Sequence, residues 1–342
     1  MRPLTVLLTA AGVPGAPALV RALRENGERD VRVVGTDMSE LAVGRHLCDA
    51  FHVTPGGGDP GFVDALLEVC TREGVDAVLP QSSYELLPLA ETRDRFEAVM
   101  LVASPEAVRR SNDKAETYAL LDGIGAPGPA WRRVRGRGTV AVAARDLGYP
   151  GDDVAVKPLE SSGSRGFRVL SSSADALQEL LTNRPGVAPA MRLEDLLALL
   201  PEDGGPELLV MELARGKERT IDGIARGGRI VLGHPKTREA MRAGLAMYFE
   251  TLDDPWLTDV AEKIVAELAL DHFFNIQLVG DKVIEINPRI STIVYQEDLN
   301  LPYLGVKFAL GELNEDELAA YASRVRPSRR ALRYFDQVEW DE

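Results

Sequence analysis

The sequence predicts an α/β fold in which a parallel sheet comes first and two further α/β regions follow. Over the first hundred residues, strand-like apolar runs alternate with helical segments, and the connections between them are short. This alternation is typical of a parallel sheet covered by helices on both faces. The chain has 342 residues, 45% of them hydrophobic and 27% charged, which is ample for a core but too long for one compact unit. We therefore expect three regions: 1–105, 106–207 and 208–342.

The first region is expected to form a Rossmann-like domain. In chain order, its predicted elements are strand Leu4–Thr9, helix Ala16–Glu25, strand Val31–Asp37, helix Gly61–Glu73, strand Ala77–Pro80, helix Glu85–Glu97 and strand Val99–Val102. The turn Thr9-Ala-Ala-Gly-Val-Pro-Gly15 resembles a dinucleotide-binding turn but lacks the full glycine pattern. The sequence favours the simpler alternative, a tight turn that packs the helix against the sheet.

The second region mixes helices and strands, and the third is richer in strands. In the second region we expect helices at Ser111–Leu121, Val140–Leu147, Ala174–Leu181 and Leu193–Leu200, and strands at Val154–Pro158 and Gly166–Leu170. Four prolines between residues 184 and 206 indicate an insertion or a mobile connection there. In the third region we expect strands at Leu208–Leu213, Arg219–Ala225, Arg229–Gly233 and Phe273–Val279, helices at Leu257–Leu268, Tyr303–Leu310 and Glu315–Ala322, and an edge strand within Leu332–Val338.

The most informative motif is Asp281-Lys-Val-Ile-Glu-Ile-Asn-Pro-Arg289. Glu285 and Asn287 are two residues apart on a predicted strand, so their side chains project from the same face. Gly280-Asp281 suits a tight turn from the preceding strand, which brings Gln277 near Glu285. Three oxygen donors on rigid strands, with Arg289 just beyond them, predict a site for Mg²⁺ and the phosphates that it accompanies.

Two lysines and a small-residue loop precede this motif. Lys157 lies at the end of a predicted strand, and Leu159-Glu-Ser-Ser-Gly-Ser-Arg-Gly166 follows it. Small residues let backbone N–H groups approach phosphate oxygens closely, although a plain hairpin turn explains such a loop equally well. Lys114 enters the first turn of a helix, which by itself favours a solvated helix start.

A strand that runs into a loop lies between the lysines and the metal motif. Leu209–Leu213 is followed by Ala214-Arg-Gly-Lys-Glu218. An exposed backbone at the end of this strand is able to form hydrogen bonds with the edge of an adenine. The carboxylate of Glu218 is able to accept hydrogen bonds from ribose hydroxyls. An ordinary strand and turn is the alternative reading.

This ordered set of motifs resembles the ATP-grasp superfamily, most closely the type of the carbamoyl-phosphate-synthase large subunit. The resemblance covers nearly the whole chain and implies an ATP-grasp fold with an N-terminal Rossmann-like domain, a small lid subdomain at 106–207 and a metal-binding domain at 208–342. It implies that Lys114 and Lys157 hold the ATP phosphates and that Arg289 steadies the acyl phosphate. The remaining roles that it implies are a phosphate-covering loop (Ser161, Ser162, Gly163, Ser164 and Gly166), adenine contacts (Glu212 and Leu213), a ribose contact (Glu218) and ligands of Mg²⁺ or Mn²⁺ (Gln277, Glu285 and Asn287).

The chain departs from the family pattern in three respects. Many relatives have the acid of the adenine strand seven residues before the ribose acid, where this chain has Met211 and places Glu212 one residue later. The loop after Lys157 lacks consecutive glycines. The chain carries a single such module, and nothing in it resembles an ammonia-generating amidotransferase.

Residues on the substrate side are less clearly marked. His234-Pro-Lys236-Thr-Arg238 follows a strand, and Lys236 and Arg238 are able to bind a substrate carboxylate or the γ-phosphate. A solvated basic turn fits the same residues. His234 and Asp222 favour structural roles, while Tyr295 and Gln296 follow the metal motif and are assigned to the acceptor side.

Composition narrows the classes of partner. The net charge of −14 argues against nucleic acid, because phosphate neutralisation requires a basic face. Cys48 and Cys70 are few and distant, so we expect a reducing cytoplasm and no disulfide framework. The apolar run Leu4–Ala10 lacks the basic segment and the length of a secretory signal, and no stretch reaches the ~20 apolar residues of a membrane span. We expect a soluble protein that acts on small molecules.

The resemblance implies an ATP-dependent ligase that activates a small-molecule carboxylate as an acyl phosphate for attack by an amine, with ADP and phosphate as products. One alternative uses bicarbonate through a carboxyphosphate, as a carbamoyl-phosphate synthase does. Another is a catalytically silent nucleotide-binding module that regulates a partner, against which the presence of both lysines and all three metal-ligand candidates counts. Related proteins often dimerise through the first domain, so a homodimer is compatible with the family. The sequence does not identify the acid or the amine.

Overall fold

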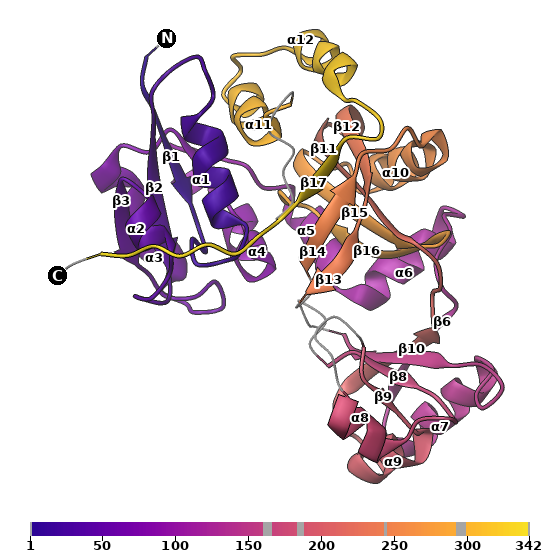
Figure 1. The fold of residues 1–342 in the computed structure, drawn as a ribbon. Helices are drawn as coiled ribbons and strands as arrows, with labels where there is room; N and C mark the ends of the chain where they lie inside the picture. Colours follow the sequence, from indigo (N-terminus) through magenta and orange to yellow (C-terminus); the bar gives the residue numbers. More distant parts are fainter. Residues whose placement is uncertain (1, 160–165, 183–187, 243–244, 292–298, 341–342) are drawn as a thin grey trace.

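A computed structural model describes residues 2–159, 166–182, 188–242, 245–291 and 299–340. It contains three large sheets in succession along the chain and a smaller fourth sheet (Figure 1). The α/β fold class is confirmed, and the N-terminal sheet is parallel throughout, as the strand-helix alternation predicts.

The first sheet has the strand order β3-β2-β1-β4-β5. Helices cover both faces: alternate strand residues pack against α1 on one side and against α3 and α4 on the other. The sequence analysis missed β3 and α2, because both are short and β3 has no fully buried residue. The bounds are β1 (Leu4–Leu8), α1 (Ala16–Arg24), β2 (Val31–Asp37), α2 (Gly44–Leu47), β3 (Ala50–Val53), α3 (Phe62–Glu73), β4 (Ala77–Leu79), α4 (Ser83–Thr92) and β5 (Val99–Met100).

The turn after β1 is closed by a carboxylate from the neighbouring strand. Asp37, at the end of β2, accepts a hydrogen bond from the backbone N–H of Gly12 at 2.8 Å. A Cβ atom at Gly12 would lie 2.9 Å from the same carboxylate oxygen, so glycine is needed for this close approach. This arrangement favours the tight-turn reading over a dinucleotide-binding loop.

Two helices lead from the first sheet to the second. The sequence predicts one helix at Ser111–Leu121, whereas the structure has α5 (Pro105–Asn112) and α6 (Lys114–Gly123). Asp113 separates them, because its carboxylate accepts the N–H groups of Ala115 and Glu116 and so begins a new helix. Lys114 therefore occupies the first position of α6.

The second sheet has the order β6-β10-β7-β8-β9 and contains a core of its own on one face. It includes β10, so it extends beyond the region boundary expected at residue 207. The sequence analysis did not predict β6, which pairs with β10. The bounds are β6 (Trp131–Arg135), α7 (Arg137–Asp146), β7 (Val154–Pro158), β8 (Arg168–Leu170), α8 (Ala176–Thr182), β9 (Ala190–Met191), α9 (Leu193–Leu199) and β10 (Glu207–Glu212).

The third sheet is antiparallel, with the order β12-β11-β15-β16. Strand β12 runs to Thr237, well past the expected end at Gly233, because an edge strand tolerates Pro235. The sequence analysis placed no strand between Glu239 and Glu250, where β13 (Glu239–Arg242) and β14 (Leu245–Glu250) lie. The bounds are β11 (Glu218–Arg226), β12 (Arg229–Thr237), α10 (Pro255–Glu267), β15 (His272–Val279) and β16 (Lys282–Asn287).

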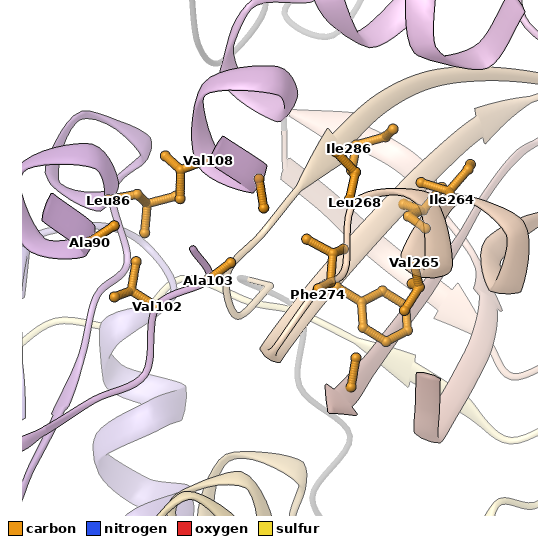
Figure 2. Packing of buried hydrophobic residues seen from close by; sticks show 14 of the residues in the cluster. Leu86, Ala90, Val102, Ala103, Val108, Ile264, Val265, Leu268, Phe274 and Ile286 are labelled. Atoms are coloured by element: carbon orange, nitrogen blue, oxygen red, sulfur yellow. The ribbon is translucent and has the colours of Figure 1, made fainter. Parts of the chain in front are cut away.

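One face of the third sheet is apolar and packs against α10. Phe274 and Ile286 from the sheet share a buried cluster with Ile264 and Val265 of the helix (Figure 2). The same cluster continues into α4 and α5, where it includes Leu86. A continuous core therefore joins the third sheet to the first region and fixes the two relative to each other.

The C-terminal segment connects the third sheet back to the first domain. Helices α11 (Leu301–Ala309) and α12 (Glu315–Ala319) lie beside α1 and β12, and β17 (Arg330–Leu332) pairs with β14 (Leu245–Glu250) beside β13 (Glu239–Arg242). The edge strand predicted within Leu332–Val338 is thus displaced toward the N-terminus. The remaining tail runs past the first domain (Figure 1), where Trp340 stacks on His46 at 3.8 Å between ring centroids.

The turn of the β15–β16 hairpin lies against the loop after β10. Gly280, in this turn, has a positive φ of 58°, and Gly216 has a φ of 126°. A Cβ atom at Gly216 would come within 2.8 Å of the Cα atom of Gly280, and one at Gly280 would clash with the carbonyl oxygen of Arg215. Glycine at both positions allows the two segments to touch.

Candidate nucleotide and metal site

The three predicted metal ligands lie together on one face of the third sheet. Gln277 of β15 is directly opposite Glu285 of β16, and Asn287 is opposite Asn275. The juxtaposition of Gln277 and Glu285 expected from the hairpin is confirmed. Gln277 and Glu285 are half-buried and Asn287 is buried. Their role as ligands remains a prediction.

Asn275, which the sequence analysis did not single out, bonds to two of these three residues. Its side-chain oxygen accepts hydrogen bonds from the amide of Gln277 at 2.8 Å and from that of Asn287 at 3.3 Å. Its own amide nitrogen donates to Asp222 at 2.6 Å and to Thr220 at 2.5 Å. The spacing contained a signal, because Asn275 lies two residues before Gln277 and so shares its sheet face.

The chemistry of this donor set suits magnesium. One carboxylate and two amide oxygens are hard ligands, and Mg²⁺ is commonly held by one or two carboxylates together with substrate phosphates. Among the described residues, no group of three His, Cys, Asp or Glu side chains is arranged to hold a metal. The residues therefore fit a cation that arrives with a nucleotide better than one that the protein binds alone.

The two predicted phosphate lysines face this hairpin from other elements. Lys157 of β7 donates to the hydroxyl of Tyr118 at 2.8 Å, and that hydroxyl donates to the carbonyl of Ile284 on β16 at 2.9 Å. Lys114 donates to the carbonyl of Leu159 at 3.0 Å. Tyr118 comes from α6, so only the tertiary structure reveals that it links Lys157 to the metal hairpin.

Burial lowers the pKa of Lys157 to about 8. The positive charge of Lys114 acts in the same direction, and the carboxylate of Glu285 opposes both. The three charges therefore share one electrostatic environment, although they come from α6, β7 and β16.

Arg289 connects the metal strand to the first domain. Its guanidinium donates to the side-chain oxygen of Asn287 at 3.3 Å and to the hydroxyl of Ser83, at the start of α4, at 3.2 Å. Burial lowers the pKa of Arg289, while the carboxylate of Glu285 raises it. Because Ser83 lies 206 residues away in the chain, sequence reasoning could not place it in this site.

A buried carboxyl group lies on the first-domain side of Arg289. Glu85 accepts a hydrogen bond from the hydroxyl of Thr9 at 2.5 Å and one from the N–H of Ser82 at 3.3 Å. Burial raises the pKa of Glu85 to about 7, and the charge of Arg289 opposes this shift. This group therefore changes charge near neutral pH within the electrostatic reach of the candidate site.

The predicted adenine and ribose residues lie at the end of β10 and the start of β11. The N–H of Glu212 donates to the carbonyl of Ala130 at 2.8 Å, and its carboxylate accepts the N–H of Ala130 at 3.2 Å. The carboxylate of Glu218 accepts from Arg238 at 2.7 Å. Leu213 is partly buried against the core. The backbone beyond Glu212, more than its side chain, is therefore the part suited to adenine.

Lys236 and the segment around it are more deeply buried than a solvated turn would be. The ammonium of Lys236 is ion-paired with Asp222, and the residue is 0% exposed. Burial lowers its pKa, and Asp222 opposes that shift. His234 is also buried, which holds its pKa well below the usual value. In this arrangement the charge of Lys236 is directed to Asp222, not to an exposed phosphate position.

Part of the predicted site lies outside the described residues, namely Ser161, Ser162, Gly163, Ser164, Tyr295 and Gln296. Gly166, which ends the small-residue loop, is described and has a positive φ of 76°. A cavity of about 440 Å³ opens next to the start of α10, lined by Gly233 and Pro235 among others, and includes none of the predicted ligands.

Two family models match the chain. Residues 6–102 match "PylC-like, N-terminal domain", and residues 205–330 match "ATP-grasp in the biosynthetic pathway with Ter operon". A carbamoyl phosphate synthase large chain from Rubrobacter xylanophilus is 26% identical over 267 residues, which cover 75% of this chain and 24% of the relative. The chain thus spans about a quarter of the length of that relative.

Solved structures share the fold. An L-amino acid ligase from Bacillus licheniformis aligns over 96% of this chain and 79% of its own, with a TM-score of 0.65 and 14% identity. The biotin carboxylase domain of the 2-oxoglutarate carboxylase from Hydrogenobacter thermophilus, in complex with MgADP, ADP and bicarbonate, aligns over 95% of this chain and 73% of its own, with a TM-score of 0.66 and 16% identity. No helix in the described part of the chain is long and apolar enough to span a bilayer.

Proposed function

We propose that this protein is an ATP-dependent ligase, because residues 205–330 match an ATP-grasp family model and residues 6–102 match a PylC-like N-terminal domain. It activates a small-molecule carboxylate as an acyl phosphate and joins it to an amine. The observation that carries this proposal is the pairing of Gln277 with Glu285 beside Asn287, with Lys157 held through Tyr118 against the same hairpin. This supports the proposal because it brings oxygen donors suited to a metal close to a lysine suited to phosphate.

The reaction divides into two displacements. A carboxylate oxygen of the substrate attacks the γ-phosphorus of ATP and ADP leaves; the amine then attacks the acyl carbon, phosphate leaves, and the amine loses a proton. The first transition state spreads negative charge over the phosphoryl oxygens, so the protein acts mainly by positioning and countercharge. Lys114, Lys157 and Arg289 supply that countercharge. A Mg²⁺ held by Gln277, Glu285 and Asn287 would neutralise further phosphate charge.

Within this proposal, the second region acts as a lid over the phosphates, with Ser161–Gly166 as its covering loop. The end of β10 and Glu218 contact the nucleoside. The acid and the amine enter from the side of Arg289, where α4 of the first domain meets the metal strand. The partners are small molecules, and the shared ATP-grasp fold is compatible with a homodimer.

A second candidate uses bicarbonate as the activated acid. The sequence similarity to carbamoyl phosphate synthase large chains favours it, as does the fold shared with a biotin carboxylase domain that binds bicarbonate. The two candidates differ only in the acid, because both pass through a mixed anhydride with phosphate.

The test is a screen of ATP turnover with mass analysis of the products. Pools of carboxylic acids and amines, each with and without bicarbonate, are incubated with the protein, Mg²⁺ and ATP, and ADP, AMP, phosphate and condensed products are measured. We expect ADP and phosphate only when an acid–amine pair is present. Glu285→Gln serves as the inactive control. AMP and pyrophosphate as products, or tight ATP binding with no turnover in any pool, would contradict the ligase.

A further inference from the structure

The geometry points to Asp222 and Asn275 as positioning residues that hold the amide oxygens of Gln277 and Asn287 toward the metal. The inference rests on the proposed function, because it concerns the same metal site. A side-chain amide presents an oxygen on one side and an NH₂ group on the other, and only the oxygen binds a metal. Something must therefore fix which way each amide faces.

Asp222 and Thr220, at the buried end of the hydrogen-bond network, determine the orientation of the Asn275 amide. Asp222 offers only acceptor oxygens when ionised, and the Thr220 hydroxyl donates its proton to the carbonyl of Ile276 at 3.0 Å. Both groups can therefore only accept from Asn275, whose NH₂ group lies 2.6 Å from the Asp222 carboxylate and 2.5 Å from the Thr220 hydroxyl. The side-chain oxygen of Asn275 must then face the other way.

That oxygen in turn orients the two predicted ligands. It accepts the NH₂ groups of Gln277 at 2.8 Å and of Asn287 at 3.3 Å, so both of these nitrogens face the interior of the network. The oxygen of Asn287 is then on the outer side, where it accepts from Arg289 at 3.3 Å. The oxygen of Gln277 is likewise turned away from Asn275, on the strand position opposite Glu285.

Lys236 completes the chain of interactions through its ion pair with Asp222. The two side chains are ion-paired in the interior, with side-chain exposures of 1% and 2%. A buried carboxylate without a partner would be costly at this depth, so the pair stabilises Asp222 in its position beside Asn275. Lys236 thus acts on the metal site through Asp222, a different role from the phosphate contact expected from its sequence position.

The test compares two double variants that differ only in whether position 222 retains an acceptor oxygen. Asp222→Leu/Lys236→Met removes the pair and the acceptor, whereas Asp222→Asn/Lys236→Met removes the charges but keeps a side-chain oxygen for Asn275. Replacing both members of a buried ion pair by apolar residues is often neutral for stability, so Asp222→Leu/Lys236→Met should fold. Asp222→Asn/Lys236→Met leaves no unpaired charge in the interior and should fold as well. Affinity for Mn²⁺ is measured by electron paramagnetic resonance titration in the presence of ADP, together with ADP affinity without metal and the thermal midpoint.

We expect Asp222→Leu/Lys236→Met to bind Mn²⁺ about 10- to 100-fold more weakly than the unmodified protein, which is typical when a group that orients a ligand is lost. Asp222→Asn/Lys236→Met should recover affinity to within a few-fold. ADP affinity without metal should be the same in both. Equal Mn²⁺ affinity in the two variants, whether normal or lost, would overturn the inference.

Two further variants keep the inference distinct from the proposed function and from a folding defect. Glu285→Gln should lose Mn²⁺ binding whatever the role of Asp222; if it binds normally, the metal site itself is wrong and both proposals fail. If only Glu285→Gln loses binding, the positioning role alone is refuted. Should the double variants not fold, Asn275→Ala provides the same measurement: weakened Mn²⁺ binding with unchanged metal-free ADP binding is expected, and normal Mn²⁺ binding would refute the role.

Discussion

The two faces of the third sheet are built from alternate residues of the same strands, yet they differ in almost every physical respect. On one face, Ile276 and Ile286 are buried in a cluster of apolar side chains that includes residues of α10. Figure 2 shows Ile286 within this cluster. On the other, Asn275, Glu285 and Asn287 form or border a network of hydrogen bonds and charges. Neighbouring positions along one strand therefore serve stability and the candidate site separately.

The comparison shows how a rigid site is made from strands. The apolar face contributes burial, about 25 cal/mol for each Å² removed from water, and does not depend on the direction of any bond. The polar face loses solvation, so each group must be satisfied by a partner in a fixed geometry. The first face holds the strands in place, and the second uses that placement to orient side chains. Substitutions on the apolar face should therefore change mainly stability, and substitutions on the polar face mainly metal binding and activity.

The largest effect is expected on the polar face. Glu285→Gln keeps the shape of the side chain but removes the only carboxylate among the three predicted ligands. We expect kcat/KM for ATP turnover to fall by about 100- to 1000-fold, as when a group that stabilises transition-state charge is removed. The thermal midpoint should change little, because Glu285 is not part of the apolar cluster. A large loss of stability with modest loss of activity would break the division between the faces.

On the apolar face, a substitution at Ile276 of β15 is expected to reduce stability and to leave metal affinity nearly unchanged. Ile276 is 0% exposed, so Ile276→Ala leaves a cavity and should lower the free energy of unfolding by about 2–5 kcal/mol. Protein that remains folded at low temperature should retain near-normal Mn²⁺ affinity. Denaturant unfolding measures the first quantity and metal titration the second. Leu199→Ala, at a leucine that is 76% exposed, is the matched control and should cost less than about 0.5 kcal/mol.

The third prediction concerns Glu85, a buried carboxyl group that makes the free energy of unfolding depend on pH. Burial raises the pKa of Glu85 from the ordinary value of 4.5 to about 7, so the folded protein binds a proton that the unfolded chain releases between these values. The free energy of unfolding should therefore fall as pH rises from about 4.5 to 7, by up to about 3 kcal/mol. Glu85→Gln, which is able to keep the helix cap, should remove this dependence. Denaturant unfolding at pH 5, 6, 7 and 8 measures it, and an unchanged slope would contradict the assignment.

The smallest effect concerns the charge of Lys157. Its pKa of about 8 means that the ammonium is present below pH 8 and is lost above it. ATP affinity should be constant from pH 6.5 to about 7.5 and then weaken by about tenfold per pH unit. Isothermal titration at several pH values measures this. Lys157→Met should bind more weakly and show no such break, whereas a wild-type affinity that stays constant to pH 9.5 would place Lys157 outside the phosphate site.

The hairpin could be predicted because its determinants are local. Gly280-Asp281 sets the turn, and the alternation of Ile with Glu and Asn sets the face of the second strand. A regular two-residue turn would pair Gln277 with Ile284, and the register shift between Gln277 and Leu278 brings Gln277 opposite Glu285 instead. The parallel order of the first sheet follows equally from short connections and repeated apolar strands. Short elements such as β3 carry too little apolar signal to be recognised, and the split between α5 and α6 depends on a single capping side chain, Asp113.

The rest of the site depends on contacts that no local pattern encodes. From the sequence, Lys236 is predicted to follow a strand and carries a positive charge, which is compatible with a phosphate contact as well as with a buried pair. Only the register of β11 against β12 and β15 brings it together with Asp222 and places Asn275 beside them. Ser83 and Tyr118 reach the site from helices elsewhere in the chain. Sequence reasoning therefore found the polar residues of the metal hairpin but missed the residues that orient or contact them.

The contact between Gly216 and Gly280 fixes the distance between the loop after β10 and the β15–β16 hairpin. One glycine follows the strand proposed to hold the adenine, and the other turns the hairpin proposed to hold the metal, so their separation governs how far the base lies from the reacting phosphorus. A single methyl group at either position would act as a spacer between nucleoside and triphosphate. Since a displacement of about 1 Å is enough to slow a reaction about 100-fold, such a spacer would be expected to reduce turnover in the proposed ligase.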